Sequence, residues 1–112
     1  METKTVVTAL AALAQDSRLA VFRALVQAGP AGLAAGKISE LTGIAPSSLS
    51  SHLKELSHAD MVSSQQAGRF VIYSAEFGTM NDLLAFLTEN CCGGNPCSTV
   101  CSPACVTDKA ST

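Results

Sequence analysis

The spacing of apolar residues divides residues 1–90 into helical and extended segments. In Ala45–Met61, Leu49, Leu53 and Leu56 form one stripe at helical spacing, which predicts an amphipathic helix. The opposite face carries short hydroxyl groups and a few longer hydrogen-bond donors. Pro46 suits the first helical position, because the N–H group that it lacks would have no intrahelical partner there.

A shorter helical segment precedes this one. Lys37–Thr42 carries Ile38 and Leu41 at helical spacing, and Gly43 follows as a stop signal. Two short helices joined by a tight, glycine-containing turn are typical of a helix-turn-helix, whose second helix enters the major groove of DNA. An ordinary amphipathic helix with a solvated serine face explains the same pattern, so this stretch alone leaves both interpretations open.

Two further helices are expected before the helix-turn-helix. The first spans Met1–Ala14. The second spans Ser17–Ala28, with Asp16 as its N-cap, and the Gly29-Pro30 pair ends it. Its apolar face is formed by Leu19, Phe22 and Val26. Residues 31–36 are small and are expected to form a connector.

After residue 60 the spacing of apolar residues changes to two, which indicates strands. Met61–Gln66 and Arg69–Ser74 predict a β-hairpin whose turn lies at residues 67–68, where a glycine is available. Phe70 and Tyr73 are expected in the hydrophobic core of the hairpin.

Helical spacing returns in Phe77–Asn90, which predicts a last helix. The order of elements is therefore helix, helix, helix-turn-helix, hairpin and helix. This order predicts a mainly α fold with a small β-hairpin wing, which is a winged helix-turn-helix.

Composition and charge limit the classes of function. The chain has 112 residues, of which 47% are hydrophobic and 14% charged, with a formal charge of −2; this indicates one folded domain. Affinity for DNA depends on neutralising phosphates, so one copy should bind DNA weakly and two copies would double the contacts. The only histidines, His52 and His58, have no nearby nucleophile pattern and there is no glycine-rich phosphate loop, so we do not expect an enzyme.

The N-terminal segment resembles part of a secretory signal, because Val6–Ala14 is apolar. Glu2 cancels the charge of Lys4, however, and the helical spacing continues toward the next helix. No apolar run is long enough to span a membrane. We therefore expect a cytoplasmic protein with no membrane partner.

The helix-turn-helix and hairpin together resemble the ArsR/SmtB family of metal- and metalloid-responsive repressors. The resemblance rests on ISELTG at 38–43, LSSHLKEL at 49–56 and GRFVIY at 68–73, and it covers about residues 5–90. It implies a homodimer built from the first and last helices, bound to double-stranded operator DNA. The sequence departs from the family at Ala45, where members often have a capping residue, and at Ser51, where they have a bulkier or charged one. It departs also at Gln65-Gln66-Ala67 of the hairpin, where arginines are often found, so no base preference is carried over.

The predicted DNA contacts lie on the second helix of the helix-turn-helix and on the hairpin. In a dimer, two such helices would enter successive major grooves roughly 34 Å apart. Hydroxyl, imidazole, amide and cationic groups would then contact bases and phosphates. The residues are Ser47, Ser48, Ser50, Ser51, His52 and Lys54 on the helix, and Gln65, Gln66 and Arg69 on the hairpin.

All five cysteines follow residue 90 in a segment rich in glycine, proline and serine. We therefore expect a DNA-binding and dimerisation domain over residues 1–92 and a flexible, cysteine-rich tail over residues 93–112. Three interpretations of the cysteines are open. Disulfides would need an oxidising compartment and would leave one cysteine over. A zinc site could use four of the thiols, and a soft, thiophilic ion could use three.

The family resemblance favours the soft ion. Many members carry a Cys-x-Cys pair in the first helix of the helix-turn-helix, but Lys37–Ile44 contains no cysteine. A vicinal cysteine pair after the last helix resembles a subgroup whose As(III) site lies there. The implied ligands are Cys91, Cys92 and Cys97, with Cys101 and Cys105 as further candidates. No cofactor is required; As(III) would act as the inducer, and Sb(III) or methylarsenite would satisfy the same thiols.

Rival functions remain open for the same fold. Oxidation of the thiols could replace metalloid binding and make the protein a redox-sensing repressor. Zn²⁺, Cd²⁺ or a copper ion could occupy the thiols instead of arsenic. A third possibility is a protein that sequesters or delivers a metalloid and uses the helix-turn-helix only as a scaffold.

Overall fold

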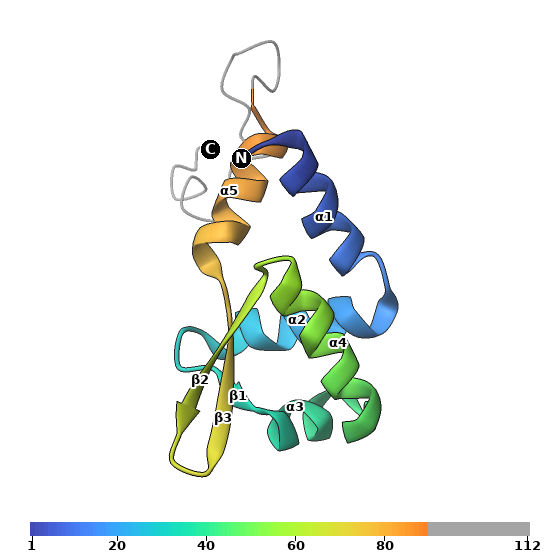
Figure 1. The fold of residues 1–112 in the computed structure, drawn as a ribbon, viewed down its shortest axis with the longest axis vertical. Helices are drawn as coiled ribbons and strands as arrows, with labels where there is room; N and C mark the ends of the chain where they lie inside the picture. Colours follow the sequence, from blue (N-terminus) through green and yellow to red (C-terminus); the bar gives the residue numbers. More distant parts are fainter. Residues whose placement is uncertain (90–112) are drawn as a thin grey trace, which may run out of the picture.

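The computed structural model describes residues 1–89, which form five helices and three strands (Figure 1). In chain order they are α1 (Thr3–Leu13), α2 (Asp16–Ala28), β1 (Leu33–Ala34), α3 (Ala35–Thr42), α4 (Pro46–His58), β2 (Val62–Ala67), β3 (Phe70–Ala75) and α5 (Phe77–Leu87). The strands form one antiparallel sheet in the order β1-β3-β2. The predicted fold, mainly α with a hairpin wing, is confirmed.

The leucine stripe predicted on α4 forms the centre of the core. Leu49, Leu53 and Leu56 are each at most 2% exposed, and they belong to one cluster with Val21 and Leu25 of α2. Burying a leucine side chain contributes about 1.5–3 kcal/mol relative to leaving it exposed. The stripe therefore fixes which face of α4 points outward.

The start of α2 differs from the prediction. Gln15, and not Asp16, is the N-cap: its side-chain oxygen accepts a hydrogen bond from the backbone N–H of Arg18 at 3.0 Å, and Asp16 is the first helical residue. An acidic residue remains favourable in the first turn because of the helix dipole. The glutamine was overlooked because its longer side chain is a less common cap than aspartate.

The buried face of α2 is also shifted. Val21 and Leu25 are completely buried and Phe22 nearly so, whereas Leu19 is exposed and Val26 half-buried. Apolar residues cover more than half of the circumference of this helix, so their spacing alone is compatible with two different buried faces. The contacts of α2 with α3 and α4 select one of them.

Arg18 joins α1 to α2. Its Nε donates to the carbonyl oxygen of Ala12 at 2.6 Å, and its Nη2 donates to that of Ala11 at 3.4 Å. Both carbonyls belong to the last turn of α1, where the dipole favours a cation. The Ala11 carbonyl oxygen also accepts the backbone N–H of Ala14 at 3.2 Å. The guanidinium group thus fixes the sharp bend between the two helices.

The connector at residues 31–36 contains a strand that the sequence did not predict. Leu33 and Ala34 of β1 pair with Tyr73 and Ile72 of β3, and α3 begins directly afterwards, two residues earlier than expected. Gly32 (φ +72°) permits this close approach, because a Cβ there would meet the Tyr73 carbonyl oxygen and lie 2.9 Å from Ile72 Cγ2. A two-residue strand is too short to show the alternation of apolar and polar residues that predicts a strand.

The hairpin turn lies one residue later than predicted. Ala67 pairs with Phe70, so Gly68 and Arg69 form the turn, with Gly68 at φ +64°. The expectation that Phe70 is in the hairpin core is wrong, because its side chain is 66% exposed. Phe70 pairs with Ala67 directly beside the turn, whereas Tyr73 is half-buried against the core.

Asp60 (φ +59°) turns the chain from α4 into β2, and α5 ends at Leu87 rather than Asn90. Within residues 1–89, no single helix has the length and hydropathy to cross a membrane. Only α1 and α2 taken together reach that length and hydropathy, and the chain bends by 100° between them. The proposed domain boundary between residues 92 and 93, and the tail after it, lie outside the described residues.

Gly32→Ala should lower the free energy of unfolding by about 2 kcal/mol or more, measured by urea denaturation. The reason is a left-handed backbone conformation, which costs alanine about 1–2 kcal/mol, together with the collision with β3. Gly36→Ala is the matched control: its Cβ would meet nothing within 4 Å in α3, where alanine is favoured by about 0.5–1 kcal/mol. Equal stability of the two variants would contradict the role given to Gly32.

Candidate nucleic-acid interface

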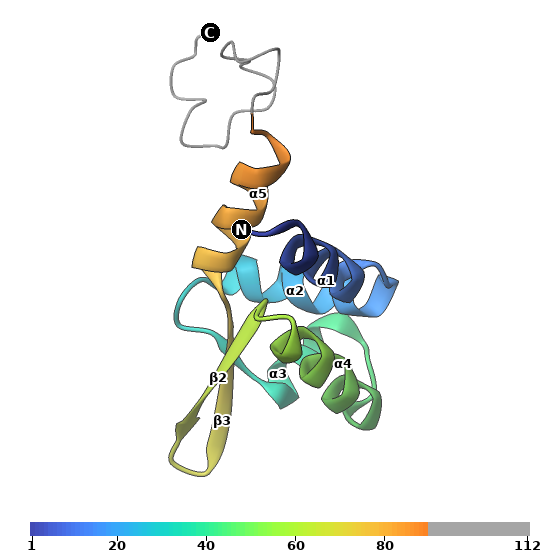
Figure 2. The same cartoon turned by 45° about the horizontal axis from the view of Figure 1, so that its top comes forward.

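The N-terminal half of α4 and the tip of the β2–β3 hairpin lie at the same end of the molecule, opposite the end that carries α1 and α5 (Figures 1 and 2). The turn between α3 and α4 is closed by Gly43 (φ +74°), whose N–H donates to the Ser39 carbonyl oxygen at 2.8 Å. The Ser39 hydroxyl donates to the carbonyl oxygen of Ile44. These bonds hold the two helices of the helix-turn-helix at a fixed angle.

The outward face of α4 is polar and accessible. Among the predicted contacts on this helix, the exposed ones are Ser47, Ser48, Ser50, Ser51 and Lys54. Ser50 donates to the Pro46 carbonyl oxygen at 3.3 Å, and no other side-chain hydrogen bond from this group is found in the described part of the chain. Their short side chains keep this face of the helix slim.

His52 differs from the serines, because it is half-buried. It lies three residues after Leu49 and four before Leu56, at the edge of the buried stripe. One part of its side chain therefore packs at the edge of the core, and the other part is accessible on the outer face of α4.

The first turn of α4 has no side-chain cap. Ala45 is the N-cap residue and Pro46 follows at the first helical position. The N–H groups that follow Pro46 therefore have no capping oxygen. Such groups, at the positive end of a helix dipole, attract anions.

The hairpin tip supplies a second polar surface. Gln65, Gln66 and Arg69 are all exposed. The side-chain amide of Gln66 donates to the carbonyl oxygen of Gly68 at 2.8 Å, across the turn. Arg69 lies in the turn itself, at the tip of the wing. The two glutamines are neighbours on one strand and therefore point to opposite faces of the hairpin.

Few cationic side chains lie at this end of the molecule. Lys37 of α3 forms an exposed ion pair with Glu40 at 3.0 Å, which offsets part of its charge. Lys54 and Arg69 form no ion pair within residues 1–89. The surface therefore offers two free cationic side chains and many neutral donors.

A groove of about 270 Å³ separates α4 from the hairpin. Its polar lining is formed by Ser50, Lys54, Ser57, His58, Ser64 and Tyr73. The sequence analysis did not single out Ser57, Ser64 or Tyr73 as contacts. Ser64 and Tyr73 are a directly opposed pair across β2 and β3, which the turn predicted at residues 67–68 would not have paired.

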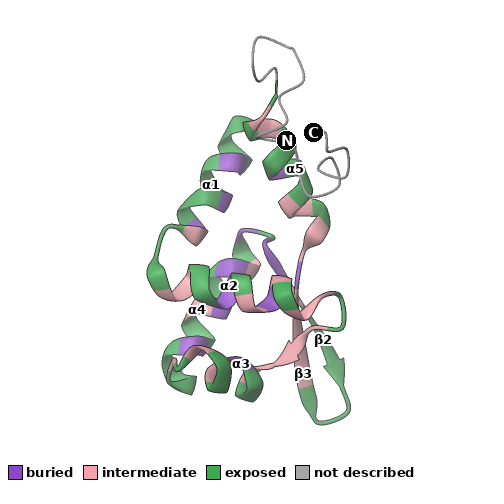
Figure 3. Cartoon of the chain, turned by 180° about the vertical axis from the view of Figure 1, so that it is seen from behind, coloured by how far each residue is buried: buried purple, intermediate pink, exposed green. Residues whose placement is uncertain are grey.

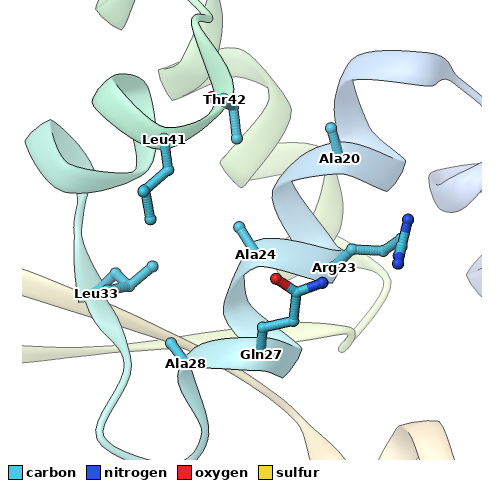
Figure 4. Close-up of a pocket in the computed structure, with 8 residues that line it drawn as sticks. All are labelled: Ala20, Arg23, Ala24, Gln27, Ala28, Leu33, Leu41 and Thr42. Carbon is cyan, nitrogen blue, oxygen red and sulfur yellow. The ribbon is translucent and has the colours of Figure 1, made fainter.

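Another hollow, of about 610 Å³, lies between α2, α3 and β1 (Figure 4). Small side chains of α2 and two leucines form most of its wall, and Arg23 is the only ionisable group that lines it. The Thr42 hydroxyl at its edge donates to the Ile38 carbonyl oxygen at 2.7 Å. This lining offers no acid–base pair and no activated nucleophile.

The opposite end of the molecule exposes apolar side chains. Val7 of α1 is 58% exposed, and Leu84 and Leu87 of α5 are 46% and 53% exposed; Leu83 is the only buried residue of α5. Most of the buried residues lie on α2, on α4, at the adjoining ends of the sheet and on one face of α1 (Figure 3). A helix with so much uncovered apolar surface is typical of an association surface.

The predicted inducer site cannot be placed. Its residues, Cys91, Cys92 and Cys97, and the further candidates Cys101 and Cys105, lie outside the described residues. Within residues 1–89, no three His, Cys, Asp or Glu side chains come together as a metal site would require.

Comparison with known proteins agrees with this geometry. Residues 13–65 match a family described as a helix-turn-helix domain. No curated protein matches the sequence. An ArsR-like transcriptional regulator from Rhodococcus sp. RHA1 has a similar structure, with a TM-score of 0.67, 23% identity and coverage of 78% of each chain.

Two further solved structures are similar. HlyU from Vibrio cholerae is 28% identical with a TM-score of 0.61, and the match covers 78% of this chain and 97% of that one. The homodimeric winged helix-turn-helix DNA-binding domain of a possible ArsR-family regulator from Mycobacterium bovis is 20% identical with a TM-score of 0.61, covering 82% and 85%. The chain thus contains a helix-turn-helix domain and has the winged helix-turn-helix fold of ArsR-family transcriptional regulators.

Proposed function

We propose that this protein is a transcriptional repressor that binds operator DNA as a homodimer and is released when As(III) binds its C-terminal cysteines. One observation carries the proposal: the serine face of α4 and the hairpin tip lie at one end, and α1 and α5, which expose apolar side chains such as Val7, Leu84 and Leu87, lie at the other (Figure 1). The first end suits a duplex and the second suits another copy of the chain.

The DNA-binding half of the proposal follows from shape and chemistry. α4 is slim on its outer face because serines cover it, so it can enter a major groove and donate hydrogen bonds to base edges. Its uncapped first turn can bind a backbone phosphate. The hairpin, with Arg69 at its tip, extends to the adjacent groove.

The dimer is proposed to form through α1 and α5. Exposed apolar side chains on both helices, such as Val7 and Leu84, would be covered there. An apolar hollow of about 440 Å³ between α2 and α5, lined in part by Leu19, Met80 and Leu84, extends the same surface. The similar domain from Mycobacterium bovis is a homodimer.

The inducer is proposed to act next to this dimer surface. Cys91 and Cys92 follow α5 within a few residues along the chain. Arsenous acid would release one water for each thiol that it binds, so Cys91, Cys92 and Cys97 would form a neutral arsenic trithiolate; thiols are the ligands that a soft ion prefers. A 100-fold loss of operator affinity requires only about 2.7 kcal/mol of coupling.

A redox-sensing repressor is the second candidate. HlyU, 26–28% identical, has been solved in a form described as reduced. Here oxidation of the same cysteines would replace arsenic as the signal. Release of DNA by peroxide, with no response to arsenite, would favour this function.

Arg69→Ala should weaken binding to the DNA upstream of the protein's own gene by about tenfold and reduce the salt slope by about 0.9, because one phosphate contact is lost. Fluorescence anisotropy at several salt concentrations measures both quantities. Arg23→Ala removes the same charge from an exposed site on α2, beside the hollow between α2 and α5, and should leave the salt slope unchanged. Equal effects of the two variants would contradict the role of the hairpin tip.

Leu84→Glu should convert the dimer to a folded monomer, because a carboxylate would be desolvated at the α5 surface. Sedimentation velocity measures the mass and circular dichroism the helix content. Leu41→Glu is the matched control, since Leu41 is 57% exposed on α3, in the helix-turn-helix. A dimer that survives Leu84→Glu with unchanged affinity would overturn the proposed interface.

The double variant Cys91→Ser/Cys92→Ser should bind the operator as the wild type does but should no longer be released by arsenite. Anisotropy with arsenite, antimonite, methylarsenite, zinc and cadmium identifies the inducer. Cys105→Ser serves as the comparison and should still respond. If arsenite still releases the double variant, the assigned ligands are wrong.

A further inference from the structure

We propose that the groove between α4 and the hairpin is a phosphate site for the DNA backbone, built by Ser57, Ser64, Tyr73 and Lys54. This inference rests on the proposed DNA-binding function and assigns three residues that the fold alone does not mark as contacts. The groove has a volume of about 270 Å³ and takes its lining from both elements.

Two elements bring the hydroxyl groups together. Ser50, Lys54 and Ser57 follow one another along the flank of α4 at helical spacing. Ser64 of β2 and Tyr73 of β3 are directly opposed and share the hairpin face that lines the groove. Opposed side chains in an antiparallel pair lie about 4.5–5.5 Å apart at Cβ, so both can reach one anion.

The chemistry of the lining suits a phosphodiester. Serine and tyrosine hydroxyls donate to phosphate oxygens, and Lys54 adds a compact positive charge. His58 also lines the groove, and no carboxylate does. Ser57, Ser64 and Tyr73 have no side-chain hydrogen bond within the described part of the chain, in contrast to Ser50, which donates to the Pro46 carbonyl oxygen.

The position of the groove fits the path of a DNA strand. If α4 enters the major groove and the hairpin reaches the adjacent minor groove, the sugar–phosphate backbone that separates the two must pass between them. The groove lined by Ser57, Ser64 and Tyr73 lies between these two elements, so the backbone would pass along it. Contacts there would set the register of α4 on the duplex without reading sequence.

The test uses the full-length protein and the shortest duplex from its own upstream DNA that the wild type binds. Tyr73→Phe and Ser64→Ala should each weaken binding roughly tenfold, since a hydrogen bond to a charged group is lost. Ser63→Ala is the matched control on the same strand: its hydroxyl lies 3.3 Å from that of Ser74, on the opposite face of the hairpin. It should bind as the wild type does. Thermal unfolding shows whether each variant is folded.

Neutral methylphosphonates, placed singly along each strand, separate a phosphate contact from a structural role. At one position the methylphosphonate should weaken wild-type binding, and Tyr73→Phe should cause no further loss on that duplex. Lys54→Gln should lower the salt slope by about 0.9. Additive losses at every position, or full affinity in both hydroxyl variants, would overturn the phosphate site while leaving DNA binding intact. A wild-type protein that binds no duplex at low salt would overturn the DNA-binding function and this site together.

Discussion

Burial of one leucine stripe on α4 is the constraint on which the rest of the structure depends. Leu49, Leu53 and Leu56 can be removed from water only by packing into the core cluster that includes Val21 and Leu25 of α2. Rotating α4 about its axis would expose leucines and bury serines, at a cost of several kcal/mol. The serine face must therefore point outward, and the position of α4 against β2 follows from the same packing.

The two ends of the molecule are linked by short, direct connections. Arg18 joins the last turn of α1 to the start of α2, and α2 packs against α3 and α4. α1 also contacts α4 directly, and β3 leads after one residue into α5. A change in how α1 and α5 are held would therefore reach the polar end through packed elements, which is the physical route that the proposed coupling between inducer and DNA would use.

The polar end depends on neutral donors more than on charge. With Lys37 paired to Glu40, the free cations of α4 and the hairpin are Lys54 and Arg69 within residues 1–89. One copy of the chain would therefore release few counterions from DNA, and this term would add little to the affinity. For a chain with a charge of −2, the remaining affinity for DNA would have to come from hydroxyl groups, from uncapped N–H groups and from the second copy of the chain in the proposed dimer.

The sequence by itself determined the five helices, the two hairpin strands and their order, because periodicity reports local burial: it shows the stripe on α4, the stop at Gly43 and the change of period after Asp60. It also indicated the serine face and the hairpin as polar surfaces. Only the tertiary structure decided which side of α2 is buried, that Leu33 and Ala34 form a strand against β3, that the turn begins at Gly68 and that Phe70 is exposed. It alone brought Ser57, Ser64 and Tyr73 to one groove. These features depend on contacts between residues far apart in the chain, which no local pattern encodes.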